Sequence, residues 1–181
     1  MTLKSLNINK GWSLFLDRDG VINKRLENDY VKTLEEFEFL EGVPGAAKIF
    51  ADVFGKIIVV TNQQGIGKGI YSENDLSIIH HYMTDEIEKH GGRFDKVYFS
   101  PHLAAHKHPW RKPNIGMALQ AKEDIPEIDF SRSIMVGDSV SDMQFGRKAG
   151  MRTVFISSEK VKNADIDFCF SSLKSFAEAL L

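Results

Sequence analysis

The chain has 181 residues, with 23 lysines and arginines, 25 aspartates and glutamates, and a hydrophobic fraction of 43%. This length and composition predict one soluble globular domain and exclude a disordered chain. The formal charge of -2 indicates no basic surface for nucleic acid or an anionic membrane, and no apolar run approaches the roughly 18 residues of a membrane span. The single cysteine, Cys169, cannot form an internal disulfide, so we expect a cytoplasmic protein.

Five short apolar runs, each followed by polar or glycine residues, predict the strands of a buried sheet. The runs are continuous rather than alternating, which is typical of parallel strands that are covered on both faces. In chain order they occupy residues 13–16, 56–60, 96–99, 133–136 and 152–156.

Helical patterns separate these runs. Pro44 suits the first turn of one helix, and Ser72 with Asp75 resembles a capping box at the start of another. Shorter helices are predicted over 114–122 and 141–149. This alternation of strands and helices predicts a doubly wound, Rossmann-like α/β fold, with a mainly parallel central sheet and helices on both faces.

The segment 21–41 is too long for a simple turn between a strand and a helix. Its aromatic residues Tyr30, Phe37 and Phe39 predict a folded-back flap. We treat residues 1–181 as a single domain without a large cap domain. The flap and a loop over 100–110 are then expected to control access to any site.

Polar residues that can carry chemistry follow three of the predicted strands. Asp17 and Asp19 follow the first run, Thr61 follows the second, and Asp138 follows the fourth, with Asp142 one turn later. Ligands of doubly wound folds bind at the carboxyl ends of the strands, where these side chains converge. Converging carboxylates repel each other unless one is protonated or a cation lies among them, and Mg²⁺ suits such oxygen ligands. Helix or turn capping would explain Asp17 and Asp138, but it would not explain Asp19.

A carboxylate beside Mg²⁺ can act as a nucleophile on phosphorus, and a second carboxylate can transfer protons. The transferring phosphoryl group needs donors and cations around its oxygens. Thr61 offers a hydroxyl, and Arg111 and Lys112 add two positive charges. Considered alone, the Arg111-Lys112 pair would also fit a solvated loop.

In this order, these residues resemble the four motifs of the haloacid dehalogenase-like (HAD) phosphatase superfamily. Within it, the chain is most similar to the D-glycero-D-manno-heptose 1,7-bisphosphate 7-phosphatases and the related histidinol-phosphatases. The four motifs correspond to residues 17–23, 60–63, 111–113 and 137–142. The features that narrow the resemblance are Asp29-Tyr30-Val31, Phe37-Glu38-Phe39, the run over 61–66, and Ser100-Pro101-His102.

The resemblance implies a Mg²⁺-dependent phosphatase that removes the 7-phosphate of heptose 1,7-bisphosphate through an aspartyl-phosphate. It makes Asp17 the nucleophile and Asp19 the general acid and base, with Thr61 and Lys112 stabilising the transferring phosphoryl group. Mg²⁺ would be held by the side chains of Asp17 and Asp138 and by the backbone carbonyl of Asp19. The alternative substrate is histidinol phosphate or another small phosphomonoester.

The resemblance also implies a set of substrate-binding residues on the flap and at two strand ends. They are Glu27, Asn28, Asp29, Tyr30, Asn62, Gln63, Gln64 and Arg111. Asp142 either orders the Mg²⁺ shell or only starts its helix. The expected partner is a small phosphorylated sugar, with no nucleic acid and no membrane, and the protein is expected to be a monomer.

One departure from the family pattern concerns a loop that in relatives is stabilised by zinc through Cys-x-His and Cys-x-Cys. Here those positions read Ser100, His102, His108 and Trp110, so only His102 of the pattern remains. With His106, three imidazoles lie close in sequence, but a structural zinc site normally has four ligands and favours thiolates. We therefore expect this loop to pack through Trp110 without zinc.

Two other classes of protein are less consistent with these residues. A non-catalytic phosphosugar-binding protein would be expected to lose its nucleophile or the partners of that nucleophile, yet the catalytic set is intact. A polynucleotide 3′-phosphatase would favour a basic groove for its substrate, which the charge balance does not indicate.

Overall fold

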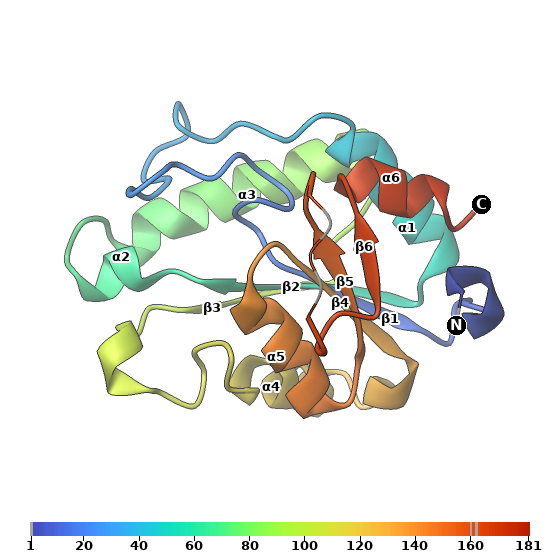
Figure 1. The fold of residues 1–181 in the computed structure, drawn as a ribbon. Helices are drawn as coiled ribbons and strands as arrows, with labels where there is room; N and C mark the ends of the chain where they lie inside the picture. Colours follow the sequence, from blue (N-terminus) through green and yellow to red (C-terminus); the bar gives the residue numbers. More distant parts are fainter. Residues whose placement is uncertain (1, 160, 162) are drawn as a thin grey trace.

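The computed structural model describes residues 2–159, 161 and 163–181, and a six-stranded sheet forms its centre (Figure 1). The spatial order of the strands is β3-β2-β1-β4-β5-β6, and all neighbouring strands run parallel. The strands are β1 (Ser13–Leu16), β2 (Lys56–Asn62), β3 (Lys96–Ser100), β4 (Ser133–Gly137), β5 (Arg152–Ile156) and β6 (Phe168–Phe170). The predicted doubly wound fold with a parallel sheet is confirmed.

Helices cover both faces of the sheet. Helices α1, α3 and α6 lie on one side of it, and α4 and α5 lie on the other (Figure 1). The helices are α1 (Val43–Val53), α2 (Gln64–Gly67), α3 (Glu73–Lys89), α4 (Gly116–Asp124), α5 (Val140–Ala149) and α6 (Leu173–Glu178). Short 3₁₀ turns occupy Leu3–Leu6, Ala104–His106 and Phe130–Arg132.

The strands send alternate side chains into two separate hydrophobic cores. Leu14 and Leu16 of β1 belong to the core that contains Phe50 of α1 and Ile79 of α3, whereas Phe15 belongs to the core on the opposite face. Because both faces are covered, every residue of β1 is buried. This double burial is the reason for the continuous apolar runs in the sequence.

Local signals predicted the helix starts well. Pro44 lies in the first turn of α1, and Ser72 and Asp75 form a complete capping box at α3. The Asp75 N–H donates to Ser72 Oγ over 3.1 Å, and the Ser72 N–H donates to Asp75 Oδ2 over 2.8 Å. The predicted helix over 114–122 instead spans Gly116–Asp124, and the helix predicted to begin at 141 begins at Val140.

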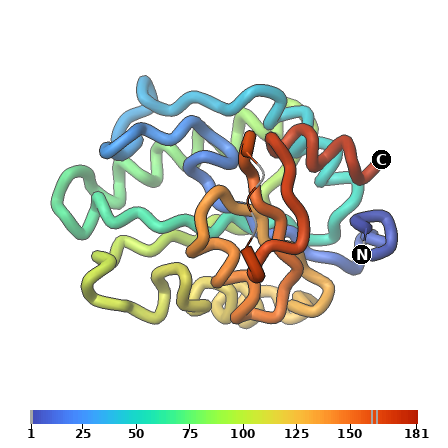
Figure 2. Tube along the Cα trace, in the orientation of Figure 1, coloured from blue at the N-terminus to red at the C-terminus, as the bar shows by residue number. Residues whose placement is uncertain are grey.

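The segment 21–41 folds back along α3, as Figure 2 shows. Its two arms are joined by hydrogen bonds from the Leu40 N–H to the Ile22 carbonyl and from the Lys24 N–H to the Glu38 carbonyl. The ring centroid of Phe37 lies 5.9 Å from that of Tyr82 on α3. We call residues 21–41 the flap.

Among the residues that the structure describes, no helix is both long and apolar enough to cross a membrane.

Candidate active site

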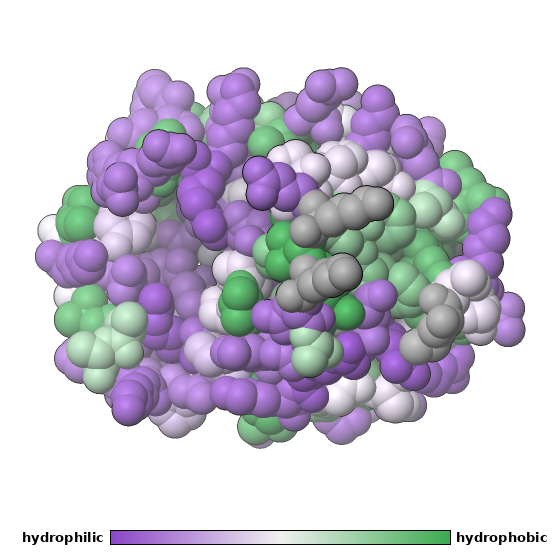
Figure 3. Space-filling model, in the orientation of Figure 1, coloured by the Kyte–Doolittle hydropathy of each residue, from purple (hydrophilic) through white to green (hydrophobic). Residues whose placement is uncertain are grey.

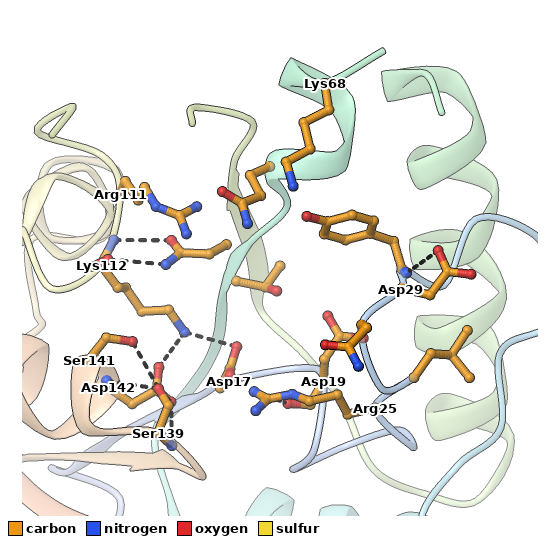
Figure 4. A pocket seen from close by; sticks show the side chains of 16 residues that line it. Asp17, Asp19, Arg25, Asp29, Lys68, Arg111, Lys112, Ser139, Ser141 and Asp142 are labelled. Carbon is orange, nitrogen blue, oxygen red and sulfur yellow. Dashed lines mark hydrogen bonds and ion pairs between the residues drawn. The ribbon is translucent and has the colours of Figure 1, made fainter. Parts of the chain in front are cut away.

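Three carboxylates converge at the C-terminal edge of the sheet. Asp17 directly follows β1, Asp138 directly follows β4, and Asp142 lies in the first turn of α5. One oxygen from each carboxylate lies within 4.8 Å of the others. Lys112 reaches between two of them, with its Nζ 2.8 Å from Asp17 Oδ1 and 2.6 Å from Asp142 Oδ1 (Figure 4).

The negative charge of this cluster exceeds what Lys112 can offset. Burial raises the pKa of Asp17 to about 7, and the carboxylate of Asp142 adds to this shift while Lys112 opposes it. Burial likewise raises the pKa of Asp138 to about 6, although the charge of Arg25 opposes the rise. Buried carboxylates with raised pKa values are the donor set that a hard divalent cation stabilises. The residues present therefore fit Mg²⁺.

The backbone of Gly20 lies close to the carboxylate of Asp138. Gly20 has a φ of 87°, and a Cβ at this position would lie 1.9 Å from Asp138 Oδ2. Only glycine therefore allows the Asp17–Gly20 turn to lie against this carboxylate.

Arg25 of the flap forms hydrogen bonds with two oxygen atoms that are expected to bind the metal. Its Nη2 donates to Asp138 Oδ1 over 2.8 Å and to the backbone carbonyl of Asp19 over 3.2 Å. Arg25 carries no signal in the sequence, because its partner Asp138 is 113 positions away. The flap thus contributes a positive charge to the carboxylate cluster.

The carboxylate of Asp19 is held by three donors. Oδ1 accepts from Arg18 Nη2 and Asn23 Nδ2, each over 2.9 Å, and Oδ2 accepts from Gln63 Nε2 over 2.8 Å. Burial acts to raise the pKa of Asp19, but the Arg18 charge and these hydrogen bonds outweigh it and hold the pKa below its usual value. Asp19 thus has a fixed orientation at the pocket wall.

Arg18 links the Asp19 carboxylate to helix α3. It follows β1 on the side of Leu14 and Leu16, and its fully buried side chain points toward α3. There Arg18 Nη1 donates to Nε2 of His80 over 3.2 Å. Burial, with a contribution from Arg18, lowers the pKa of His80 to about 3, so the imidazole is neutral and can accept this hydrogen bond.

Asp142 has two roles in the geometry. Its Oδ2 accepts a hydrogen bond from the Ser139 N–H over 3.1 Å, which completes a capping box at the start of α5. Its other oxygen contacts Lys112. Asp142 was expected either to order the Mg²⁺ shell or only to start its helix. In the structure it starts the helix and also belongs to the carboxylate cluster.

A cavity of about 520 Å³ opens above these carboxylates, within the usual range for small-molecule sites. In Figure 3 the surface is hollowed left of its centre, where hydrophilic residues surround the recess. The predicted site residues that line this cavity are Asp17, Asp19, Asn28, Asp29, Tyr30, Thr61, Asn62, Gln64, Arg111 and Lys112. Asp142 lines it as well, together with Ser139 and Ser141 of the fourth motif, which were assigned no role. Arg25, Leu26 and Lys68 also line the cavity and were not predicted.

Two predicted substrate contacts lie elsewhere. The side chain of Gln63 is only 1% exposed and points back to Asp19 and Thr61, so it does not line the cavity. Glu27 is exposed on the flap and is also absent from the cavity wall. In both cases the neighbour in sequence, Asn28 or Gln64, faces the cavity instead.

The histidine-containing loop packs through stacked rings. The centroids of His102 and His108 lie 3.3 Å apart, and the Trp110 ring contacts Tyr98 with centroids 6.5 Å apart. Within the described part of the chain, the one group of three potential ligands that lie close together is Asp17, Asp138 and Asp142.

Comparisons with known proteins identify the family of the chain. The HAD-hydrolase-like family model matches residues 109–174. A D-glycero-alpha-D-manno-heptose-1,7-bisphosphate 7-phosphatase of Campylobacter jejuni is 39% identical over 162 residues, which cover 90% of this chain and 91% of the relative. A D-glycero-beta-D-manno-heptose-1,7-bisphosphate 7-phosphatase of Rhodopseudomonas palustris is 36% identical over 146 residues, which cover 76% and 78%.

A solved structure shares the whole fold. It is the D,D-heptose 1,7-bisphosphate phosphatase from B. bronchiseptica, complexed with magnesium and phosphate. It superposes with a TM-score of 0.84 at 26% identity, covering 93% of this chain and 97% of that chain.

Proposed function

The chain belongs to the family of D-glycero-D-manno-heptose 1,7-bisphosphate 7-phosphatases, which are HAD-like hydrolases, and we propose that it hydrolyses the 7-phosphate of this sugar to leave heptose 1-phosphate. It is a phosphoric monoester hydrolase that uses Mg²⁺.

The distribution of charge in the cavity carries this proposal. Asp17, Lys112 and Asp142 lie at its floor, whereas Lys68 and Arg111 lie at its far side (Figure 4). A substrate with phosphates at both ends fits this arrangement, because one phosphate can meet the reacting carboxylate while the other meets the distant cations. Histidinol phosphate carries only one phosphate and would leave Lys68 and Arg111 without an anionic partner.

The chemistry follows from the positions of two carboxylates. Asp17 attacks the phosphorus of the 7-phosphate, the bond between phosphorus and the sugar oxygen breaks, and Asp19 gives a proton to that oxygen. Asp19 is ionised in the free protein, and the negative charge of the bound phosphate raises the pKa of its carboxyl so that it can carry this proton. Asp19 then takes a proton from the water that hydrolyses the aspartyl-phosphate. Thr61 and Lys112 donate to the oxygens of the transferring phosphoryl group.

Mg²⁺ would be held by the side chains of Asp17 and Asp138 and by the carbonyl of Asp19. When bound, it neutralises charge that accumulates on the phosphoryl oxygens.

Replacement of Arg25 by Gln is expected to strengthen Mg²⁺ binding by about tenfold. The Arg25 guanidinium forms hydrogen bonds with two oxygens that would bind the metal, and its positive charge repels the cation. Isothermal titration calorimetry of metal-free protein measures this change directly. Lys24→Gln is the matched control, since Lys24 pairs with Glu38 on the exposed side of the same flap. Unchanged or weaker Mg²⁺ binding by Arg25→Gln would contradict the assigned metal ligands.

Phosphate release tests the substrate. We expect kcat/KM on heptose 1,7-bisphosphate to exceed that on histidinol phosphate by at least about 100-fold, since loss of contacts to a second phosphate costs several kcal/mol. The α and β anomers are assayed separately, because relatives named for each anomer match the chain. Higher activity on histidinol phosphate would overturn the substrate assignment.

We also propose that residues 1–181 act as one domain, as a cytoplasmic monomer without nucleic-acid or membrane partners. The single domain is supported by one continuous six-stranded sheet that runs through the described residues.

A further inference from the structure

Gln63 connects two residues of the active site from behind the cavity wall. Its Nε2 donates to Asp19 Oδ2 over 2.8 Å and to Thr61 Oγ1 over 2.9 Å. Its Oε1 accepts a hydrogen bond from the hydroxyl of Tyr71. Both Gln63 and Tyr71 are buried, at 1% and 7% exposure, and neither lines the cavity.

Tyr71 anchors the acceptor end of this amide. An amide has a donor end and an acceptor end, and rotation by 180° would place Oε1 against the carboxylate of Asp19. The ionised Asp19 carboxylate can only accept and therefore selects Nε2, while the Tyr71 hydroxyl holds the opposite end of the amide by donating to Oε1. Burial raises the pKa of Tyr71, so the hydroxyl keeps the proton that it donates.

The ring of Tyr71 is itself held in place. A Cβ on Gly65 would lie 2.2 Å from Tyr71 Cε1, so the absence of a side chain there lets the ring pack against the turn after β2. On the flap, the Tyr30 ring lies 6.1 Å away between centroids. Tyr71 also directly precedes the capping box of α3, so its backbone is anchored by a long helix.

The amide orientation has consequences for both reacting partners. Because Thr61 Oγ1 accepts from Gln63, its own hydrogen is available to donate into the cavity, which Thr61 lines. Asp19 receives one of its three donors from the same amide. A rotated amide would turn the Thr61 hydrogen toward Oε1 and repel the Asp19 carboxylate.

We propose that Tyr71 is a positioning residue for phosphoryl transfer, which acts through Gln63 to orient the Asp19 carboxylate and the Thr61 hydroxyl. This inference rests on the proposed function, in which Asp19 transfers protons and Thr61 binds the phosphoryl group. It assigns a role to a residue that touches neither the substrate nor the metal.

The test is Tyr71→Phe, which keeps the ring and removes only the hydroxyl. We expect kcat to fall by about tenfold, in the range seen when a supporting hydrogen bond behind an active-site residue is removed. KM should stay within about twofold because Tyr71 does not line the cavity. Tyr98→Phe is the matched control, since the buried Tyr98 hydroxyl donates to Asp124 Oδ2 outside the cavity. Its kcat should remain at the wild-type value.

A double-mutant cycle separates positioning through Gln63 from a general structural effect. In a Gln63→Leu background, Tyr71→Phe should cause no further loss of kcat. Unchanged kcat in Tyr71→Phe, or an equal tenfold loss in both backgrounds, would overturn the inference.

The cycle is run on heptose 1,7-bisphosphate and on 4-nitrophenyl phosphate. Inactivity of the wild-type protein on the heptose would count against the proposed function alone. The comparison of variants on 4-nitrophenyl phosphate would still decide the role of Tyr71.

Discussion

Asp17→Asn is expected to lower kcat by roughly 10⁴-fold or more while the protein remains folded, because removal of a catalytic nucleophile has effects of this size. An amide oxygen is a poor nucleophile, so no aspartyl-phosphate can form at position 17. Phosphate release under saturating Mg²⁺ measures the loss, and mass spectrometry of the acid-quenched reaction detects the phosphorylated wild-type protein.

The same variant should be at least as stable as the wild type without Mg²⁺ at pH 8. The folded-state pKa of Asp17 is about 7, above the ordinary value of 3.8. The folded state therefore loses stability through this group as pH rises from about 4 to 7, and the full penalty is present at pH 8. An asparagine side chain at this position carries no charge and avoids the penalty, which thermal denaturation in EDTA can detect.

Asp52→Asn, an exposed position on α1, serves as the control for Asp17→Asn in both assays. Near-normal turnover by Asp17→Asn would refute the covalent mechanism. A large fall in melting temperature would instead show that the carboxylate of Asp17 stabilises the metal-free fold.

Lys112→Met should damage stability and activity together. Lys112 is 3% exposed and contacts the buried carboxylates of Asp17 and Asp142, so its loss leaves them without a counter-charge. Removal of one partner of a buried ion pair lowers the free energy of unfolding by about 3–5 kcal/mol. Activity should fall by about 10²–10³-fold, because a donor to the transferring phosphoryl group is removed. Urea denaturation in EDTA and phosphate release measure the two effects.

Lys24→Met is the matched control for this variant. The pair between Lys24 and Glu38 is also short, at 2.6 Å, but its side chains are 53% and 65% exposed. Solvent screens such a pair, so the free energy of unfolding should change by less than about 1 kcal/mol. Equal destabilisation by Lys24→Met and Lys112→Met would show that burial does not set the importance of Lys112.

The sheet was predictable where strands are buried on both faces. The runs that became β1 and β5 were predicted with their exact bounds, and every position but one in them is buried. Strand β6 was missed because Phe168–Phe170 is a three-residue edge strand whose side chains are partly or largely exposed. Helix α6, with only six residues, also carries too short a pattern to be recognised.

The residues of the site that lie at strand ends were predictable for a related reason. Asp17, Thr61 and Asp138 lie at or just beyond strand ends, and parallel strands place these ends at one edge of the sheet. Strand register therefore translates sequence position directly into spatial position. The flap residues and the turn after β2 have no such register, which is why Glu27 and Gln63 were assigned to the cavity wall and lie elsewhere.

The parallel fold, the family and the carboxylates of the site could be predicted from the residues alone, because these features depend on local apolar runs and on motifs that follow strand ends. Two contacts could be seen only in the folded chain: Arg25 meets Asp138, and Tyr71 holds the Gln63 amide whose other end meets Asp19. The direction of a side chain in a loop depends on which distant segment packs against it. That information resides in contacts between segments rather than in the spacing of residues along the chain.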